Sequence, residues 1–316
     1  MDLLSSLSCR LALLHKGQLV EYSKVVRMTA VRKTMYLIND TGSSNHAGCK
    51  AVMRSLLSSI KEIGSIDLIG TCKHTELSVD EATYRNSDII FVNGEGTIHH
   101  SNRHALHLLH LIGRAKRDGK KVVLANALFQ QYEYSDDSIL EGLSLLAVRE
   151  PRSSAFARSF RGDPRMFVDV AADPRFLDEG TPIPGKSGFL IGGFHEKGLL
   201  YDPFADIPGR RLSLRNTSFE DVVATLREAD IYLTAQHHGV YAAALAGCPF
   251  VASPSNSHKI ESFLDWCRMP VPVCMSLREV EPATRFALRN RGMYSELAEV
   301  IRTLPQLTSR VIREHV

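Results

Sequence analysis

Short apolar runs alternate with segments of helical periodicity along most of this chain. Each run has the length of a buried strand, and a polar or glycine-containing loop follows it. In the first half of the chain the runs occupy residues 35–39, 66–69, 88–93, 122–125, 145–148 and 167–170. Strands that alternate with helices are typical of parallel sheets covered by helices, so the pattern predicts an α/β fold.

A second set of runs follows a segment rich in Gly and Pro. Residues 177–187 show no helical period, and we interpret them as a linker between two domains. Beyond the linker, the expected strands are 188–191, 231–233, 250–252 and 271–274, and the expected helices include 218–229 and 294–316. The predicted organisation is an N-terminal helix and linker (1–30), Rossmann-like domains (31–178 and 188–290) and a C-terminal helix (291–316).

The N-terminal segment is apolar over residues 3–14, with Asp2 before it and Arg10 inside it. This pattern predicts an amphipathic helix that docks on the body of the protein or on a partner. The segment lacks the basic start of a signal peptide, and no stretch approaches the roughly 20 apolar residues of a membrane span. The sequence therefore predicts no transmembrane segment and leaves peripheral contact with a membrane open.

The composition is that of a globular protein, with 44% hydrophobic and 23% charged residues and a net charge of +3. Because no Lys/Arg run accompanies this small charge, a nucleic-acid-binding protein is not expected. The six cysteines contain no C-x-x-C pair. They favour reduced thiols in a cytoplasmic enzyme over a disulfide scaffold or a zinc site. The oligomeric state is not predicted.

The most informative stretch runs from residue 230 to residue 260. An apolar strand ends in a polar corner with paired histidines (236–238), and an alanine-rich helix follows (239–246). A second strand leads into a polar loop (253–259) that opens the next helix. Because such loops gather at the carboxyl ends of parallel strands, where ligands bind, the stretch predicts a site for an anion or a phosphorylated substrate.

Loops in the first half of the chain carry candidate chemistry as well. Residues 40–48 connect a strand to a helix whose N-terminus can receive an anion. Glu95 stands between two glycines after the strand 88–93. It either accepts a proton or binds a sugar hydroxyl, or it only orders the turn or caps the following helix. Arg149 ends another strand and either clamps an anion or forms an ion pair.

Five histidines recur near one predicted helix. Histidines four residues apart share a helix face and can bind a metal. No H-E-x-x-H pattern and no Cys or Asp at a ligand spacing accompanies them, so we expect satisfied or exposed histidines and no metal site. The five are His99, His100, His104, His107 and His110.

Seven motifs occur in a fixed order along the chain. They are Ile38-Asn39-Asp40-Thr41, Asn93-Gly94-Glu95-Gly96, Val148-Arg149-Glu150 followed by Ser153, residues 170–176 ending in Asp173-Pro174-Arg175-Phe176, His238-Gly239, Ala244-Leu245-Ala246-Gly247-Cys248-Pro249 and Lys259. Taken in this order, they resemble the polysaccharide pyruvyl transferase family over roughly residues 35–265. The resemblance implies two Rossmann-like domains that face each other across a cleft, as in a GT-B glycosyltransferase.

The resemblance also implies a reaction, the transfer of a pyruvyl group from phosphoenolpyruvate to two hydroxyls of a sugar in surface-polysaccharide (exopolysaccharide) biosynthesis. It implies His238 as general acid and Glu95 as base, with Arg149 and Lys259 as contacts for the donor's negative groups. The expected partners are a small-molecule donor and a saccharide acceptor, and no cofactor is expected. The predicted substrate-binding residues are Asn39, Asp40, Thr41, Asn45, His46, Asn93, Gly94, Gly96, Thr97, His99, Arg149, Gln236, His237, Gly239, Ser257 and Lys259.

The sequence departs from the family pattern at two positions. Gln236 stands where the family typically has Arg, and Glu95 replaces the middle residue of a triple-glycine turn. A Gln side chain is neutral and cannot provide the permanent positive charge of an Arg guanidinium. A glycosyltransferase with a nucleotide-activated sugar donor, including an acidic one, is therefore an alternative, in which His238 and Lys259 hold the donor phosphate and Glu95 activates the acceptor. A third interpretation is a non-catalytic module that binds a sugar or a partner. The acid/base groups in the loops, such as Glu95 and His238, argue against it.

Overall fold

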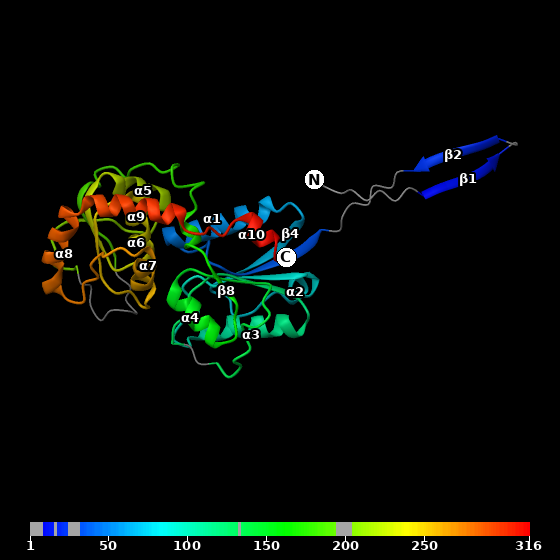
Figure 1. Cartoon of the computed structure of the whole chain (residues 1–316), viewed down its shortest axis with the longest axis horizontal. Coiled ribbons are helices and arrows are strands. Elements are labelled where there is room, and N and C mark those ends of the chain that lie inside the picture. Colours follow the sequence, from blue (N-terminus) through cyan, green and yellow to red (C-terminus); the bar gives the residue numbers. More distant parts are fainter. Residues whose placement is uncertain (1–8, 16–17, 25–31, 132–133, 194–203) are drawn as a thin grey trace. The chain divides into compact units, whose positions relative to one another are not determined.

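The computed structural model describes residues 9–15, 18–24, 32–131, 134–193 and 204–316 (Figure 1). Contacts divide the chain into two units, Met1–Arg32 and Lys33–Val316. In the described part of the first unit, β1 (Cys9–His15) and β2 (Gln18–Lys24) form an antiparallel hairpin.

The helix expected near the N-terminus is wrong over residues 9–14, which belong to β1. The first part of that prediction, residues 3–8, lies outside the described residues. A short apolar run fits a helix or a strand equally well. Here a second run containing Val20 and Tyr22 provides a pairing partner of high strand propensity, so β2 replaces part of the expected linker.

The first sheet of the second unit is parallel, with the strand order β4-β3-β5-β6-β7-β8. Met35 and Leu37 of β3 share a core cluster with α1, whereas Tyr36 and Ile38 share another with α3. Helices therefore cover both faces, which explains why the strands are continuous apolar runs. The elements are β3 (Lys33–Asp40), α1 (Ala47–Glu62), β4 (Ile66–Lys73), α2 (Glu81–Asn86), β5 (Ile89–Asn93), α3 (Arg103–Arg117), β6 (Lys121–Ala127), β7 (Leu145–Val148), α4 (Pro151–Ser159), β8 (Pro164–Met166) and the 3₁₀ turn η1 (Val170–Ala172).

The second sheet is also parallel, with the order β10-β9-β11-β12. The expected α/β architecture of parallel sheets flanked by helices is thus confirmed. One core cluster includes residues of both sheets, such as Phe91 and Ile231, and the domain boundary expected near residues 178–188 stays a prediction. The elements are β9 (Gly188–Ile191), β10 (Arg210–Arg211), α5 (Phe219–Arg227), β11 (Ala229–Thr234), α6 (His237–Ala246), β12 (Phe250–Ala252), α7 (Lys259–Cys267), α8 (Leu277–Arg289), α9 (Arg291–Thr303) and α10 (Ser309–Arg313).

Two expected strands differ in the structure. The run 167–170 ends in η1, because the Asp169 carboxylate caps that turn by accepting a hydrogen bond from the Ala171 backbone N–H at 3.0 Å. The run 271–274 makes an isolated bridge, in which Val273 pairs with Ala252. The first segment is buried and the second is buried at Val271 and Cys274, and burial alone does not distinguish a strand from an ordered loop.

The C-terminal segment holds two helices where one was expected. Leu304 precedes Pro305 and is extended (φ −67°, ψ 150°), which ends α9. The Pro305 carbonyl accepts a hydrogen bond from the Val168 backbone N–H (2.9 Å). The chain thereby returns from the second sheet to the first, where α10 lies beside α1 (Figure 1).

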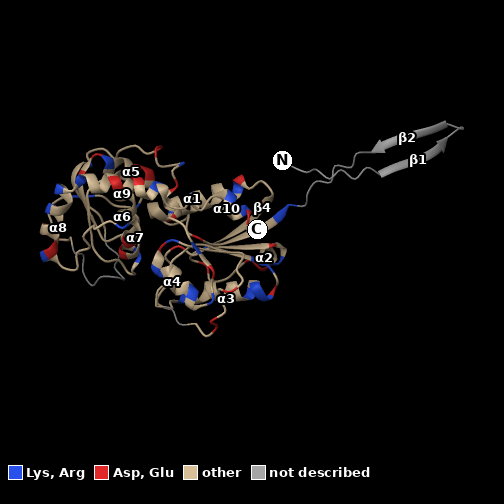
Figure 2. Cartoon of the chain, in the orientation of Figure 1, with Lys and Arg blue, Asp and Glu red and all other residues tan. Residues whose placement is uncertain are grey.

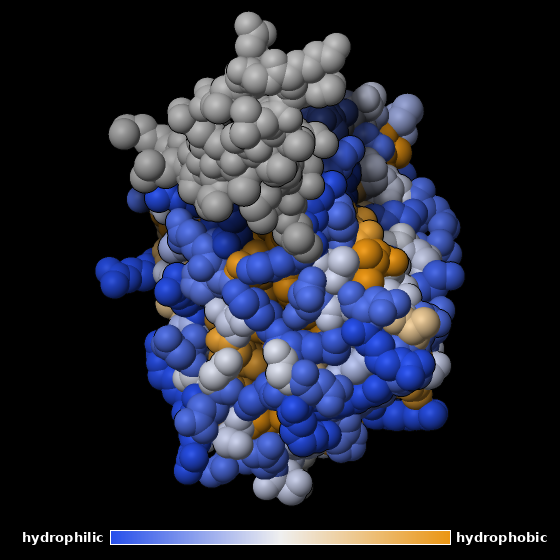
Figure 3. Space-filling model, turned by 90° about the vertical axis from the view of Figure 1, so that its right-hand side faces the viewer, coloured by the Kyte–Doolittle hydropathy of each residue, from blue (hydrophilic) through white to orange (hydrophobic). Residues whose placement is uncertain are grey.

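The surface of the described residues is mostly polar. Lys and Arg are interspersed with Asp and Glu on the helices (Figure 2), in keeping with the small net charge. The face in Figure 3 is mainly hydrophilic outside the grey atoms. Over the described part of the chain, the exposed large hydrophobic side chains are Ile69, Met275, Leu277 and Leu288. Among the described helices, all are too short or too polar to cross a lipid bilayer.

Candidate active site

Two adjoining cavities lie where loops from both sheets meet. We call the first the charged pocket; it has a volume of about 420 Å³ and includes Glu95, Arg149, His238 and Lys259 in its lining. We call the second the amide pocket; it has a volume of about 780 Å³ and is lined mainly by amide, hydroxyl and imidazole groups. The two pockets share Thr41, His74, Gly96, Thr97 and Asn256. The loops that line them follow β3, β5, β7, β11 and β12, the carboxyl ends of parallel strands.

A buried carboxylate, Asp169, lies beside the charged pocket. Its Oδ2 is 2.6 Å from Arg149 Nη1, 3.2 Å from His237 Nε2 and 3.8 Å from His238 Nε2. Its Oδ1 accepts a hydrogen bond from Asn126 Nδ2 at 3.4 Å. Burial by itself raises the pKa of Asp169, but Arg149 and the two histidines outweigh that effect and hold the pKa well below its usual range. Asp169 is therefore an anion around which the cationic and imidazole groups are arranged.

His237 and His238 occupy the first turn of α6, immediately after β11. Burial and the positive charge of Arg149 lower the pKa of His237 to about 3. Burial also lowers the pKa of His238 well below its usual range, although Asp169 opposes that shift. Both imidazoles are therefore neutral at pH 7 when the pocket holds no ligand.

Lys259 is the first residue of α7 and lines the charged pocket. Its Nζ donates a hydrogen bond to Asn256 Oδ1 at 2.5 Å. Burial, reinforced by Arg149, lowers the pKa of Lys259 to about 7, while Glu95 opposes the shift. Since a lysine near its pKa exchanges protons readily, Lys259 can bind an anion or transfer a proton.

Glu95 lies on the loop after β5 with a left-handed backbone conformation (φ 29°). Its Oε2 accepts hydrogen bonds from Thr41 Oγ1 (2.8 Å) and from Asn93 Nδ2 (3.4 Å). Gly94 is needed beside it, because a Cβ there would lie 2.6 Å from the Ala127 Cβ. Glu95 thus orders the loop and also lines the charged pocket, and its role as a proton acceptor stays a prediction.

The predicted site residues fall into two groups. Most of them line a pocket: Asn39, Thr41, His46, Glu95, Gly96, Thr97, His99, Arg149, Gln236, His237, His238, Ser257 and Lys259. Asp40, Asn45, Asn93, Gly94 and Gly239 line neither pocket.

The residues of the second group support the loops. Asp40 accepts a hydrogen bond from the Gly42 N–H (2.8 Å), and the Asn45 carbonyl accepts one from the Asn216 N–H (3.0 Å). A Cβ at Gly239 would lie 2.6 Å from Thr234 Oγ1, so this glycine lets α6 approach β11.

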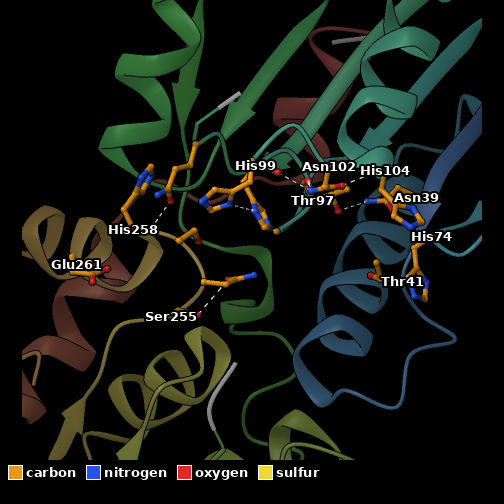
Figure 4. Close-up of a pocket in the computed structure, with 15 residues that line it drawn as sticks. Asn39, Thr41, His74, Thr97, His99, Asn102, His104, Ser255, His258 and Glu261 are labelled. Carbon is orange, nitrogen blue, oxygen red and sulfur yellow. Dashed lines mark hydrogen bonds between the residues drawn. The ribbon is translucent and has the colours of Figure 1, made fainter. Parts of the chain in front are cut away.

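Of the five histidines near α3, His99, His100 and His104 line the amide pocket. Figure 4 shows this pocket between Asn39, Thr41 and His74 on one side and Ser255 and His258 on the other. In the part of the chain that the structure describes, the group of side chains close enough together to hold a metal ion lies elsewhere. It consists of His46, Cys49 and His238, whose ligand atoms are all within 4.8 Å of one another.

Sequence reasoning missed several residues of the site, of which Asp169 is the most important. It interrupts the apolar run 167–170, and an acidic residue inside a buried run is a signal of a paired or hydrogen-bonded charge. Cys49 and His74 carried no such signal, because their place in the site depends on chain segments distant in the sequence.

Comparison with known protein families matches the chain to the model for polysaccharide pyruvyl transferases over residues 34–257. The chain belongs to the polysaccharide pyruvyl transferase family. As a member of that family it is a transferase. Among curated proteins, none matches the chain.

Solved structures similar to this pyruvyl transferase family member have the GT-B-like arrangement. One is "Spinosyn Rhamnosyltransferase SpnG complexed with thymidine diphosphate" (TM-score 0.50, 10% identity, covering 89% of this chain and 99% of that chain). Another is the UDP-N-acetylglucosamine 2-epimerase from Rickettsia bellii (TM-score 0.51, 12% identity, covering 90% and 96%). At these identities the likeness shows the fold alone, and it confirms the expected GT-B-like class.

Proposed function

We propose that this family member transfers the pyruvyl group of phosphoenolpyruvate to two hydroxyls of a saccharide, in the cytoplasm, for the synthesis of a surface polysaccharide. The observation that carries the proposal is the charged pocket, which is lined by Arg149, Lys259 and His238 together with Glu95. Five cysteines are free thiols, which fits a reducing compartment: Cys49, Cys72, Cys248, Cys267 and Cys274.

The charged pocket is the proposed donor site. A small donor with a carboxylate and a phosphate suits a cavity of about 420 Å³ that offers a guanidinium and a lysine. The negative charge of such a donor raises the pKa of Lys259 and of His238, so both gain a proton as the donor binds. Asp169 then stabilises the imidazolium from 3.8 Å.

The proposed reaction uses His238 as acid and Glu95 as base. His238 donates a proton to the methylene carbon of phosphoenolpyruvate, and a sugar hydroxyl adds to the neighbouring carbon while Glu95 takes the hydroxyl proton. A second hydroxyl then forms a second C–O bond to that carbon, its proton leaves with the phosphate, and the bond between carbon and the phosphate oxygen breaks. The products are a cyclic ketal and inorganic phosphate.

The amide pocket is the proposed acceptor site. Amide and hydroxyl side chains both donate and accept hydrogen bonds, as sugar hydroxyls require. Thr41 borders both pockets and donates to Glu95, so a sugar in the amide pocket reaches the base at the shared boundary.

Ligand-induced stabilisation tests the donor. At 100 times its dissociation constant a ligand stabilises the fold by about 2.7 kcal/mol. We expect phosphoenolpyruvate to raise the melting temperature and pyruvate, which lacks the phosphate, to raise it less. Release of inorganic phosphate from phosphoenolpyruvate in the presence of candidate saccharides then tests transfer.

A glycosyltransferase with a nucleotide-activated sugar is the second candidate function. Gln236 favours it, because this neutral residue lines the charged pocket where the family typically supplies Arg. The larger amide pocket has room for a nucleotide. Stabilisation by UDP, CMP or GDP, with none by phosphoenolpyruvate, would reject pyruvyl transfer in favour of this candidate.

A further inference from the structure

We propose that His46, Cys49 and His238 form a binding site for a thiophilic divalent cation of the zinc class. The proposal has a second part, which rests on the proposed function: an ion at this site blocks transfer, because it removes His238 from proton transfer.

The three ligand atoms lie near coordination geometry. All are within 4.8 Å of one another. Metal–ligand bonds of about 2.0–2.3 Å in a tetrahedral site place ligand atoms roughly 3.5 Å apart, so small side-chain movements close the site. The His46 and His238 ring centroids are 5.4 Å apart, with the rings tilted by 49°.

The ligands stand on anchored segments of both sheets. His46 precedes α1 and Cys49 lies in its first turn, in an H-x-x-C spacing, whereas His238 lies in the first turn of α6. His46 pairs with Arg215 in a β-bridge, and the Ala47 N–H donates to the Leu214 carbonyl at 2.7 Å. These bonds fix the start of α1 against the second half of the molecule.

Gly48 allows the imidazole of His238 to approach the start of α1. A Cβ at residue 48 would lie 2.1 Å from His238 Cγ and 2.3 Å from its Nδ1. The Nδ1 side of the ring therefore faces the segment that carries His46 and Cys49, while Nε2 is 3.8 Å from Asp169 Oδ2. A carboxylate that faces the second nitrogen of an imidazole is the usual environment of a metal-ligating histidine.

The donor set decides the class of ion. A thiolate and two imidazoles suit Zn²⁺, whereas Mg²⁺ and Ca²⁺ prefer oxygen ligands. All three residues line the charged pocket, so the fourth coordination position opens toward solvent or a bound anion.

Cobalt absorption tests the site directly and without any assay of transfer. The full-length chain is stripped with a chelator and titrated with Co²⁺, and a thiolate-to-cobalt charge-transfer band should saturate at one ion per chain. The band should vanish in Cys49→Ser, and His46→Asn should weaken Zn²⁺ binding by about tenfold or more in competition with a chromophoric chelator. Absence of the band in the unsubstituted protein would overturn the proposal.

Cys72→Ser is the matched control. The Cys72 thiol lies outside both pockets, 3.5 Å from the Ser78 carbonyl, and a serine hydroxyl can replace it there. This variant should keep the cobalt band and the Zn²⁺ affinity. Metal-free melting curves check that Cys49→Ser and His46→Asn are folded, and equal Zn²⁺ affinity in the control and both variants would also reject the site.

Transfer activity tests the second part. Zn²⁺ should inhibit the unsubstituted protein at concentrations that fill the site, and the same concentrations should inhibit the remaining activity of Cys49→Ser less. Stimulation by Zn²⁺ would reject the blocking role. If the cobalt band appears but phosphoenolpyruvate neither binds nor reacts, the metal site stands and the proposed function fails.

Discussion

A buried carboxylate, Asp169, governs the electrostatics of the candidate active site at the scale of single residues. It compensates the buried charge of Arg149, which an apolar environment would otherwise make costly. The pKa of Lys259 and of both histidines is nevertheless lowered, because burial penalises their charged forms. The site therefore holds fewer positive charges than its basic groups would carry in water, and binding of an anion should draw protons from the solvent onto them.

We predict that His238→Ala and Glu95→Gln each lower turnover by about 100-fold or more, the usual scale for a positioned acid or base. Steady-state kinetics on the purified variants, with melting curves to confirm folding, provides the measurement. His110→Asn is the control, because this exposed histidine lies outside both pockets. Near-normal turnover in both site variants contradicts their roles.

Lys259 gives a prediction about pH. Its pKa is lowered to about 7, so the lysine is charged below pH 7 and neutral above it. The affinity for phosphoenolpyruvate should therefore fall as the pH rises through about 7, and binding at pH 8 should take up a proton. Calorimetric titration in buffers of different ionisation enthalpy measures that uptake. In Lys259→Met the affinity should be lower and this proton uptake reduced; an uptake equal to that of the unsubstituted protein would assign it to another group.

At the scale of elements, the N-terminal ends of α1, α6 and α7 bring His46, His238 and Lys259 into one pocket. The start of α4 braces the start of α7. The Glu150 carboxylate caps α4 by accepting hydrogen bonds from the Arg152 and Ser153 N–H groups. The same carboxylate is hydrogen-bonded to Ser262 of α7 and to His258, the residue that precedes α7. A capping carboxylate thus also fixes the helix that carries Lys259.

Glu150→Gln should destabilise the protein in a pH-dependent way. Burial alone raises the pKa of Glu150, but hydrogen bonds from His258 and Ser262 bring it below its ordinary value of 4.5. The ionised carboxylate therefore stabilises the fold above that pH, and its contribution disappears as the pH falls through the lowered pKa. We expect a loss of about 1.5–3 kcal/mol at pH 7, the range for hydrogen bonds to a charged group, and a smaller loss near pH 4.

Chemical denaturation at the two pH values measures this difference. Glu299→Gln, which removes an exposed ion pair with Arg302, is the matched control and should change the free energy of unfolding by less than about 1 kcal/mol. An equal loss at both pH values for Glu150→Gln would show that the ionised carboxylate is not responsible.

At the scale of the whole molecule, the end of the chain returns from the second sheet to the first. Leu307 and Ile312 are buried in the core cluster that also contains α1 residues such as Leu56. The hydrogen bond between the Val168 N–H and the Pro305 carbonyl fixes the crossing. The C-terminal segment therefore connects the two sheets whose loops line both pockets.

Ile312→Ala should lower the free energy of unfolding by about 2–5 kcal/mol, the usual cost of truncating a buried isoleucine. Arg313→Ala, at the exposed neighbouring position, should have little effect. Equilibrium denaturation of both variants tests the expectation. Similar stability for the two would mean that α10 does not hold the C-terminal segment on the first sheet.

The sequence by itself determined the alternation of strands and helices and the loops that carry the chemistry. Buried parallel strands are short apolar runs, and polar residues directly after them can only lie at the carboxyl ends of the sheet. Glu95, Arg149, His238 and Lys259 were predicted for this local reason, and the structure places all four in one pocket.

Only the tertiary structure decided which groups meet and in what charge state. The run 9–14 is a strand because residues 18–24 pair with it, and its apolar pattern alone does not distinguish a strand from a helix. Packing between distant segments brings Asp169, Cys49 and His46 close to His238. The H-x-x-C spacing of His46 and Cys49 supplies only two metal ligands, and the sequence does not show which residue is the third. The pKa shifts likewise depend on burial and on charges brought together by folding, which no local pattern encodes.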